Sequence, residues 1–154
     1  MHTNFFMVYY LTVIMKLTVV YLNNNQPACI VYQQASQTLI FTMITSTQNA
    51  EHYTWGESCD GWHLLKSATL SVIQERMPQG TAEQLHYHHH AQQVFYVLSG
   101  TATFEVVGET ETVTANQSIH IPPQTRHRIS NNGNEDLHFL VISEPKAHGD
   151  RVNL

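Results

Sequence analysis

The chain has 154 residues, a formal net charge of −5 at pH 7 and only 12% charged residues. That length suits one ordinary domain and is too short for two. Seven Lys and Arg residues provide no basic surface for a phosphate backbone, so nucleic acid is not expected as a partner. Eleven histidines are unusual beside so few cations. Because neutral imidazole is the commonest metal ligand in proteins, the composition points towards a metal site.

The first 42 residues differ from those that follow in the pattern of apolar and polar residues, because they show no sustained period and few charges. Residues 5–22 are largely apolar, but Lys16 interrupts the run, no basic region precedes it and no small-residue cleavage site follows it. We therefore expect neither a membrane segment nor a signal peptide. The widely spaced Cys29 and Cys59 fit a reducing, cytoplasmic compartment. Residues 1–42 are predicted to be an extension outside the core, either disordered or translated from a mis-assigned start codon, before one domain over residues 43–154.

Short runs rich in β-branched and aromatic residues follow one another through that domain. Strands are predicted over residues 69–77, 93–100, 101–107, 110–115, 118–123, 126–130 and 137–143. Turn formers separate these runs, for example Gly100, Gly108 and the sequence NNGNED at 131–136. No convincing amphipathic helix is present. The pattern is typical of an all-β sandwich or barrel.

The sequence HYHHH at residues 86–90 is the strongest chemical feature. In a strand, His86, His88 and His90 would share one face, while Tyr87 and His89 would take the other. Two imidazoles at positions i and i+2 can reach one ion. A solvated, histidine-rich loop is the alternative interpretation of this stretch alone. His89 and His90 are expected near the mouth of the barrel.

Two spaced motifs surround these histidines. They are Gly80-x5-His86-x-His88-x4-Gln93-x6-Gly100 and Pro122-x-Gln124-x2-His127-x3-Asn131. Over residues 70–145 the chain resembles the cupin superfamily, in particular its small cupin-2-like and RmlC-like members. The resemblance implies a jelly-roll barrel, also called a double-stranded β-helix.

The resemblance also implies a metal site. In the family, two histidines, an acid and a third histidine converge on one ion inside the barrel, which here gives His86, His88, Gln93 and His127. Gln93 stands where the family usually has Glu. Its amide oxygen either binds the ion, which would be Mn, Fe, Ni or Zn, or hydrogen-bonds a metal-bound water.

Two further departures concern turns of the second motif. Asn116 and Gln124 stand where the family has glycine. Asn116 is a mild change, because asparagine tolerates positive φ better than most residues. Gln124 predicts a somewhat different turn after the two prolines that precede it.

Other conspicuous residues receive structural interpretations. His120 and His138 alternate with apolar neighbours and should lie on the opposite face of their strands. Arg126 and Arg128 have the opposite parity to His127, which favours a solvated outer face. A packing strand or a lid is predicted for the aromatic residues Tyr53, Trp55 and Trp62.

The sequence leaves two functions open. The first is a metal-dependent enzyme, an oxygenase, isomerase or lyase, in which the ion activates O2 or polarises a carbonyl or enediol. The second is a non-catalytic cupin that binds a small molecule or a sugar, with a structural or incidental metal. The small molecule is expected to be anionic, and the resemblance implies a homodimer with no membrane partner.

Overall fold

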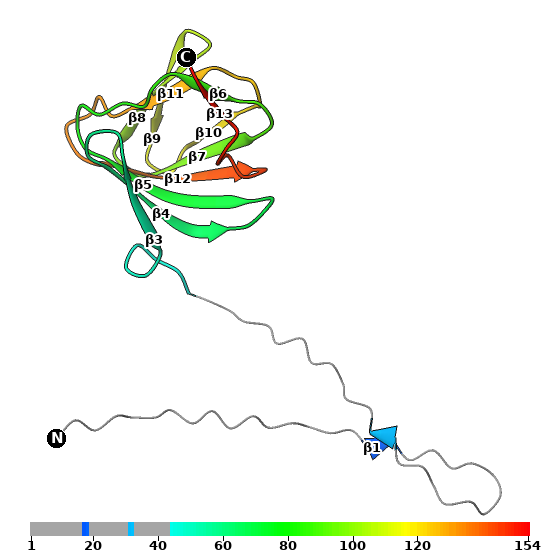
Figure 1. Cartoon of the computed structure of the whole chain (residues 1–154). Helices are drawn as coiled ribbons and strands as arrows, with labels where there is room; N and C mark the ends of the chain where they lie inside the picture. The colour runs from blue at the N-terminus through cyan, green and yellow to red at the C-terminus, as the bar shows by residue number, and fades with distance from the viewer. Residues whose placement is uncertain (1–16, 19–30, 33–43) are drawn as a thin grey trace, which may run out of the picture. The chain divides into compact units, whose positions relative to one another are not determined.

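A computed structural model describes residues 17–18, 31–32 and 44–154 (Figure 1). The chain divides into two units, Met1–Thr42 and Met43–Leu154. In the first unit, β1 (Leu17–Thr18) pairs antiparallel with β2 (Val31–Tyr32). The rest of the predicted extension lies outside the described residues. No helix in the described part of the chain is long and apolar enough to cross a bilayer.

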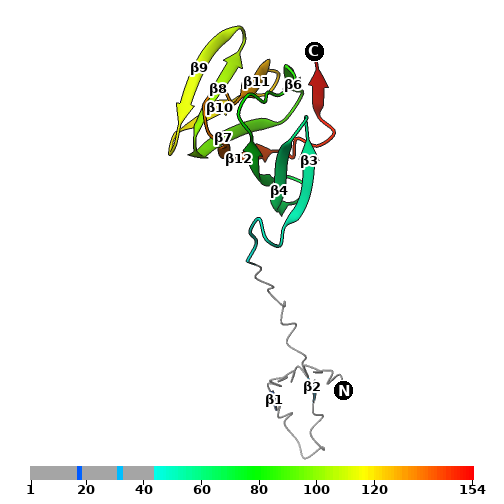
Figure 2. The same ribbon diagram turned by 90° about the vertical axis from the view of Figure 1, so that its left-hand side faces the viewer.

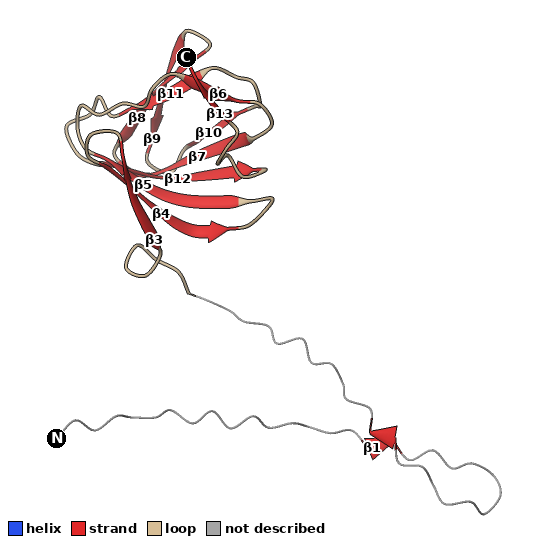
Figure 3. Cartoon of the chain, in the orientation of Figure 1, coloured by secondary structure: helices blue, strands red, loops and turns tan. Residues whose placement is uncertain are grey.

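The second unit is built from two antiparallel sheets that face each other, with only strands and loops among its described residues (Figure 3). The larger sheet has the spatial order β10 (Ser118–Ile121), β7 (Gln92–Ser99), β12 (Leu137–Glu144), β5 (Ser71–Met77), β4 (Cys59–Lys66) and β3 (Glu51–Trp55). The smaller has the order β13 (Arg151–Asn153), β6 (His86–His88), β11 (His127–Ser130), β8 (Thr101–Val106) and β9 (Glu109–Thr114). In Figure 2 the β8–β9 hairpin and the β3–β4 pair lie on opposite sides of this unit. The predicted all-β fold is confirmed.

Period-two alternation explains where the core lies. Along β5, β7 and β12 every second side chain is buried, so each strand turns one face towards the space between the sheets. Phe95 packs on Phe104 of the facing sheet, with ring centroids 5.1 Å apart, and on Phe139 at 6.1 Å. Aromatic pairs at these distances contribute about 0.5–1.5 kcal/mol beyond the area that they bury. The phenylalanine cluster therefore holds the two sheets together.

The predicted strands from residue 69 to residue 143 are all present, with ends displaced by at most two residues. The strands β3, β4 and β13 were not predicted with bounds from the sequence. Glu51–Trp55 and Cys59–Lys66 carry charges and Gly61, which weaken their strand signal. The packing strand predicted around Tyr53 is confirmed, because β3 pairs with β4 along its whole length.

Two of the three non-glycine residues with positive φ in the described chain are Asn116 and Gln124 of the second motif. Asn116 has φ 66°, as its tolerance of this region suggests, and Gln124 has φ 61°. Gln124 therefore adopts the left-handed conformation that glycine reaches most readily. Its N–H donates a hydrogen bond of 2.7 Å to the carbonyl oxygen of His88. This bond fixes the turn to β6 and offsets a backbone cost of about 1–2 kcal/mol.

A chain that begins at Met43 is expected to fold like the full chain, because every strand of the two-sheet unit lies downstream of it. Thermal unfolding should give a midpoint within about 3 °C of the full-length value. A chain that begins at Cys59 is the control, since it lacks β3 and exposes the edge of β4. Its midpoint should fall by more than about 5 °C. An equally large fall on removal of residues 1–42 would contradict the domain assignment.

Candidate metal centre and pocket

Three histidines meet on the inner side of the smaller sheet. His86 and His88 are the inward residues of β6, and His127 begins β11. The two strands pair so that His127 lies opposite His86, and the ring centroids of these two residues are 4.3 Å apart. One ring nitrogen from each of the three residues lies within 4.8 Å of the others. All three side chains are buried, so the imidazole rings form a cluster with little exposure to water.

His90 does not join this cluster. The predicted shared face with His86 and His88 is wrong for His90, because β6 ends at His88 and the chain bends away. The His90 side chain is 79% exposed, and its Nδ1 lies 2.9 Å from a carboxylate oxygen of Asp150. The other oxygen of Asp150 accepts hydrogen bonds from the backbone N–H groups of His90 and Ala91, both at 2.8 Å. This residue pair fastens the C-terminal segment to the loop between β6 and β7.

Hydrogen bonds to backbone carbonyls set the tautomers of two ligand candidates. His86 Nδ1 lies 2.9 Å from the carbonyl oxygen of Gln84, and His127 Nδ1 lies 2.8 Å from that of Thr125. A carbonyl oxygen can only accept, so each Nδ1 carries the proton. In a neutral ring Nε2 is then a bare lone pair. The Nδ1 atom of His88 is buried, and no group in the described residues forms a hydrogen bond with it.

Burial keeps these rings neutral. Desolvation, with a smaller contribution from His127, lowers the pKa of His86 to about 3 and that of His88 to about 4. Desolvation also lowers the pKa of His127. At neutral pH the cluster therefore offers uncharged imidazoles, the form in which histidine binds a metal ion.

Gln93 completes the cluster from the facing sheet. Its side chain on β7 is buried, and Oε1 lies 3.0 Å from His127 Nε2. With the His127 proton on Nδ1, this contact joins two acceptors, which a cation between them would satisfy. The amide Nε2 donates to Ser143 Oγ at 3.3 Å. Rotation of the amide by half a turn satisfies the metal-free protein, because Nε2 then donates to His127 and Oε1 accepts from Ser143.

A pocket of about 300 Å³ opens beside these residues. Its lining consists of Tyr53, Trp55, Glu75, Glu83, His86, His88, Gln93, Phe95, Val141, Ala147, His148, Gly149 and Arg151. His127 does not line it and lies behind the other ligand candidates, 1% exposed. The volume is at the lower end of the range for small-molecule sites, which begins near ~300 Å³. The interior of the unit can therefore hold a small ligand next to the histidines.

Several pocket residues were missed in the sequence. Glu75 carried a usable signal, because it shares the inward parity of Ile73 and Met77 on β5. His148 and Arg151 carried none, since they reach the pocket only through the pairing of β13 with β6. The interpretation of Tyr53 and Trp55 as packing residues only is corrected by their place in the pocket wall.

The charged groups of the pocket are arranged in two ways. Arg151 Nη1 lies 3.0 Å from Glu83 Oε1, which pairs one carboxylate with one cation. Glu75 instead accepts a hydrogen bond of 2.8 Å from the hydroxyl group of Tyr53. Desolvation, reinforced by the nearby charge of Glu83, raises the pKa of Glu75 to about 8. Glu75 is thus a neutral carboxylic acid around pH 7.

Residues interpreted as structural lie outside the site. His120 is exposed and lies 3.0 Å from Gln92 Oε1, and Arg128 pairs with Glu105 at 2.7 Å. Arg126 is exposed and His138 is partly buried. The outer-face interpretation of both arginines and of His120 is confirmed.

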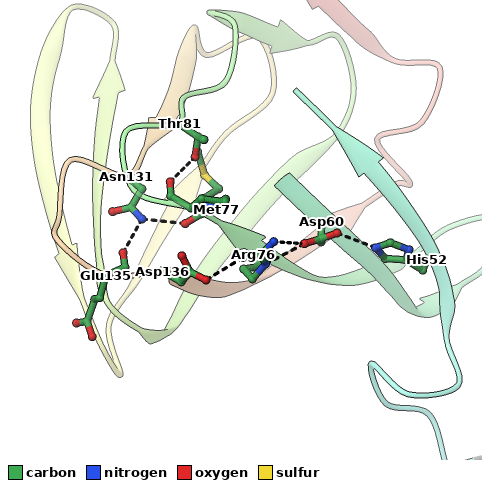
Figure 4. A network of polar contacts seen from close by, with 9 residues as sticks. His52, Asp60, Arg76, Met77, Thr81, Asn131, Glu135 and Asp136 are labelled. Atoms are coloured by element: carbon green, nitrogen blue, oxygen red, sulfur yellow. Dashed lines mark hydrogen bonds and ion pairs between the residues drawn. The ribbon is translucent and has the colours of Figure 1, made fainter. Parts of the chain in front are cut away.

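A separate polar network fixes the loop that follows the second motif (Figure 4). Asn131 Nδ2 donates to the carbonyl oxygens of Met77 and Glu135, both at 2.8 Å. Arg76 bridges Asp60 at 2.6 Å and Asp136 at 2.8 Å. These bonds hold the 131–136 loop on the end of β5 and involve none of the ligand candidates. Asn131 therefore serves the fold.

The comparisons with known proteins agree with this geometry. The Cupin domain model of the cupin-2 family matches residues 73–143. An uncharacterized protein of Methanocaldococcus jannaschii is 32% identical over 89 residues, which are 57% of this chain and 71% of that protein. The chain belongs to the cupin superfamily.

Two further similarities carry descriptive names. An oxalate-binding protein of Thermotoga maritima is 30% identical over 67 residues, 44% of this chain and 55% of that protein. The crystal structure of a predicted oxalate decarboxylase from Thermotoga maritima aligns with a TM-score of 0.63 and 21% identity, over 68% of this chain and 100% of that one. The chain also matches several mannose-1-phosphate guanylyltransferases, of which it spans at most 20%.

The lowered histidine pKa values predict an acid-sensitive protein when metal is removed by a chelator. Unfolded histidine titrates near ~6.5, so between that pH and about pH 4 the unfolded chain binds more protons than the folded one. The contribution of His88 to stability is therefore fully present above about pH 6.5 and is lost as the pH falls towards about 4.

The variant His88→Gln isolates this contribution. Its melting temperature should rise relative to that of the wild type as the pH is lowered from about 7.5 to about 4.5. The exposed His120→Gln is the control and should show no such trend. A constant difference between His88→Gln and the wild type across this range would show that His88 is not held neutral by burial.

Proposed function

We propose that this protein is a metal-dependent cupin enzyme that acts on a small anionic molecule, of the oxygenase, isomerase or lyase type. His86, His88 and His127 hold one divalent ion, and Gln93 is the fourth protein ligand. The observation that carries the proposal is the convergence of three buried, neutral imidazoles with ring nitrogens within 4.8 Å of one another.

Two details of the cluster fit a metal. The first is the buried Nδ1 of His88, which has no hydrogen-bond partner in the described part of the chain. The second is the 3.0 Å contact between His127 Nε2 and Gln93 Oε1, which places an amide oxygen beside a ring nitrogen of the cluster. A buried polar atom without a partner costs about 1–3 kcal/mol, so a ligand for the Nδ1 atom of His88 stabilises the folded protein.

The donor set indicates the kind of ion. Imidazole nitrogen and an amide oxygen suit Mn, Fe, Ni or Zn and do not suit the all-oxygen preference of Ca or Mg. All four donors are neutral, so the double positive charge of the ion is not reduced by its protein ligands. When bound, such an ion supplies a Lewis acid for an anionic oxygen of the substrate. This charge balance supports a carboxylate-bearing substrate.

A binding protein without catalysis is the second candidate. The similarity to an oxalate-binding protein favours it, and the similarity in fold to a predicted oxalate decarboxylase is compatible with the enzyme. Protein purified without a chelating tag would be assayed for metal, then mixed with oxalate and assayed for oxygen uptake and carbon dioxide release. Turnover supports the enzyme, whereas tight oxalate binding without turnover supports the binding protein.

A homodimer and a cytoplasmic location also remain predictions of this proposal.

His127→Ala should remove the metal while the two sheets stay folded. His127 lies behind the pocket wall, so its loss affects the ion without widening the entrance. Metal affinity should fall by at least about 10-fold, measured by elemental analysis after dialysis against a weak chelator. His120→Ala, an exposed change, is the matched control. Full metal content in His127→Ala would rule out this site.

Gln93→Glu should bind the ion more tightly and bind anions more weakly. A carboxylate cancels one unit of the ion's charge, and at 4 Å that unit is worth about 4 kcal/mol at an effective dielectric constant near 20. The measurements are two titrations, one with Zn²⁺ and one with azide on the zinc-loaded protein. Gln74→Glu makes the same change at a partly buried position on the opposite face of β5 and should leave both affinities unchanged. If azide affinity is equal or higher in Gln93→Glu, the Gln93 side chain does not tune the ion.

A further inference from the structure

A row of three residues crosses β3, β4 and β5 on the wall that faces the histidines. Tyr53 is the register partner of Gly61, and Gly61 is the register partner of Glu75. Tyr53 extends over the glycine and reaches Glu75, two strands away, with a hydrogen bond of 2.8 Å. A Cβ atom on Gly61 would clash with the ring of Tyr53. The glycine is therefore what allows the tyrosine to contact the acid.

Glu75 forms no ion pair with any residue that the structure describes. Arg76 pairs with Asp60 and Asp136, and Arg151 pairs with Glu83. Within the described part of the chain, the side chain of Glu75 receives one hydrogen bond, which comes from Tyr53 and reaches Oε1. Oε2 has no protein partner among those same residues, and Glu75 lines the pocket. The carboxyl group of this buried residue, which is 8% exposed, keeps its proton.

The groups around Glu75 do not reverse this conclusion. The titratable and charged groups that share its pocket are Tyr53, Glu83, His86, His88, His148 and Arg151. On β4, Cys59 and His63 flank Gly61 on the same face. The histidines of the cluster are neutral, and Arg151 is paired with Glu83, whose own pKa is raised by desolvation. Desolvation, followed by the charge of Glu83, raises the pKa of Glu75 and outweighs the hydrogen bond from Tyr53 and the charge of Arg151, which lower it.

We propose that Glu75 is the acid of this pocket, the residue that gives a proton or a strong hydrogen bond to an oxygen atom of a bound carboxylate ligand, and that Tyr53 is its positioning residue. The inference deepens the proposed function, because a neutral Glu75 leaves the ion as the source of net charge in the pocket. In the proton transfer, the O–H bond at Oε2 breaks and an O–H bond forms on the ligand oxygen. The hydrogen bond from Tyr53 then stabilises the carboxylate until solvent returns a proton.

The first test measures protonation without metal or ligand. The full chain, with ¹³C at the Glu side-chain carboxyl carbons, is titrated by NMR, and the Glu75 signal is assigned by its loss in Glu75→Gln. The midpoint should lie near 8. The signal of Glu111, an exposed residue of β9, is followed in the same spectra as the internal reference. A Glu75 midpoint below about 6 would overturn the proposal.

The second test concerns Tyr53. Its hydroxyl group stabilises the ionised carboxylate, so Tyr53→Phe should move the Glu75 midpoint upwards while the ring still fills its place. Gly61→Ala should move the midpoint in the same direction, because it displaces the ring. Tyr53→Phe alone decides the matter if Gly61→Ala does not fold. An unchanged midpoint in Tyr53→Phe removes Tyr53 from the positioning role.

The third test uses malonate as the carboxylate probe, titrated calorimetrically into the zinc-loaded full chain at about pH 6.5 and about pH 9.5. The malonate affinity of the wild type should be at least about 10-fold lower at the higher pH than at the lower pH. The loss should be smaller in Glu75→Gln, because its side chain stays neutral at both pH values. No malonate binding at the lower pH, or the same pH dependence in both proteins, overturns the acid role. If zinc does not load, the proposed metal function fails, whereas the NMR midpoints still decide the protonation of Glu75.

Discussion

The pairing of β6 with β11 is the contact on which the site depends. It places His127 opposite His86 and thereby joins two segments that are forty-one positions apart in the sequence. Each ring is oriented by the same local device, a hydrogen bond from Nδ1 to the carbonyl oxygen two residues earlier. Hydrogen bonds to the residues just before β6 and β11 thus offset part of the cost of burying the imidazoles, and one ring nitrogen of each histidine remains close to those of the other two.

The facing sheet supplies what this cluster lacks. Phe95 packs between the core and the ring of His127, with centroids 6.0 Å apart, so the same aromatic side chain joins the sheets and supports a ligand candidate. Two residues before it on the same face, Gln93 reaches the cluster. Gln93 thus places a neutral amide beside the histidines, whereas Glu75 on β5 places a carboxyl group in the wall of the same pocket. In the proposed function, the Lewis-acid centre and the group that carries the proton are therefore on different strands of the larger and smaller sheets.

The sequence predicted the parts of the fold that depend on local signals. Turn residues and β-branched runs predicted the strands from residue 69 to residue 143, and the resemblance to the cupin superfamily predicted that His86, His88 and His127 come together. Non-local geometry explains what was missed. The sequence pattern predicted His90 on the same strand face as His86 and His88. The strand ends at His88, and His90 instead contacts Asp150. Arg151 reaches the pocket through β13, a three-residue strand that no local pattern marks.

The pocket wall has a consequence for how this chain should be compared with other cupins. Of the thirteen lining residues, six lie outside residues 73–143, the segment that the family model matches, and they are Tyr53, Trp55, Ala147, His148, Gly149 and Arg151. The shared segment contributes the histidines and Gln93. The rest of the pocket wall comes from β3 and from residues 147–151, which Asp150 fastens to the loop before β7. Relatives that agree in the shared segment can therefore differ in ligand preference. A substrate assigned from the motifs alone takes no account of nearly half of the residues that line the pocket.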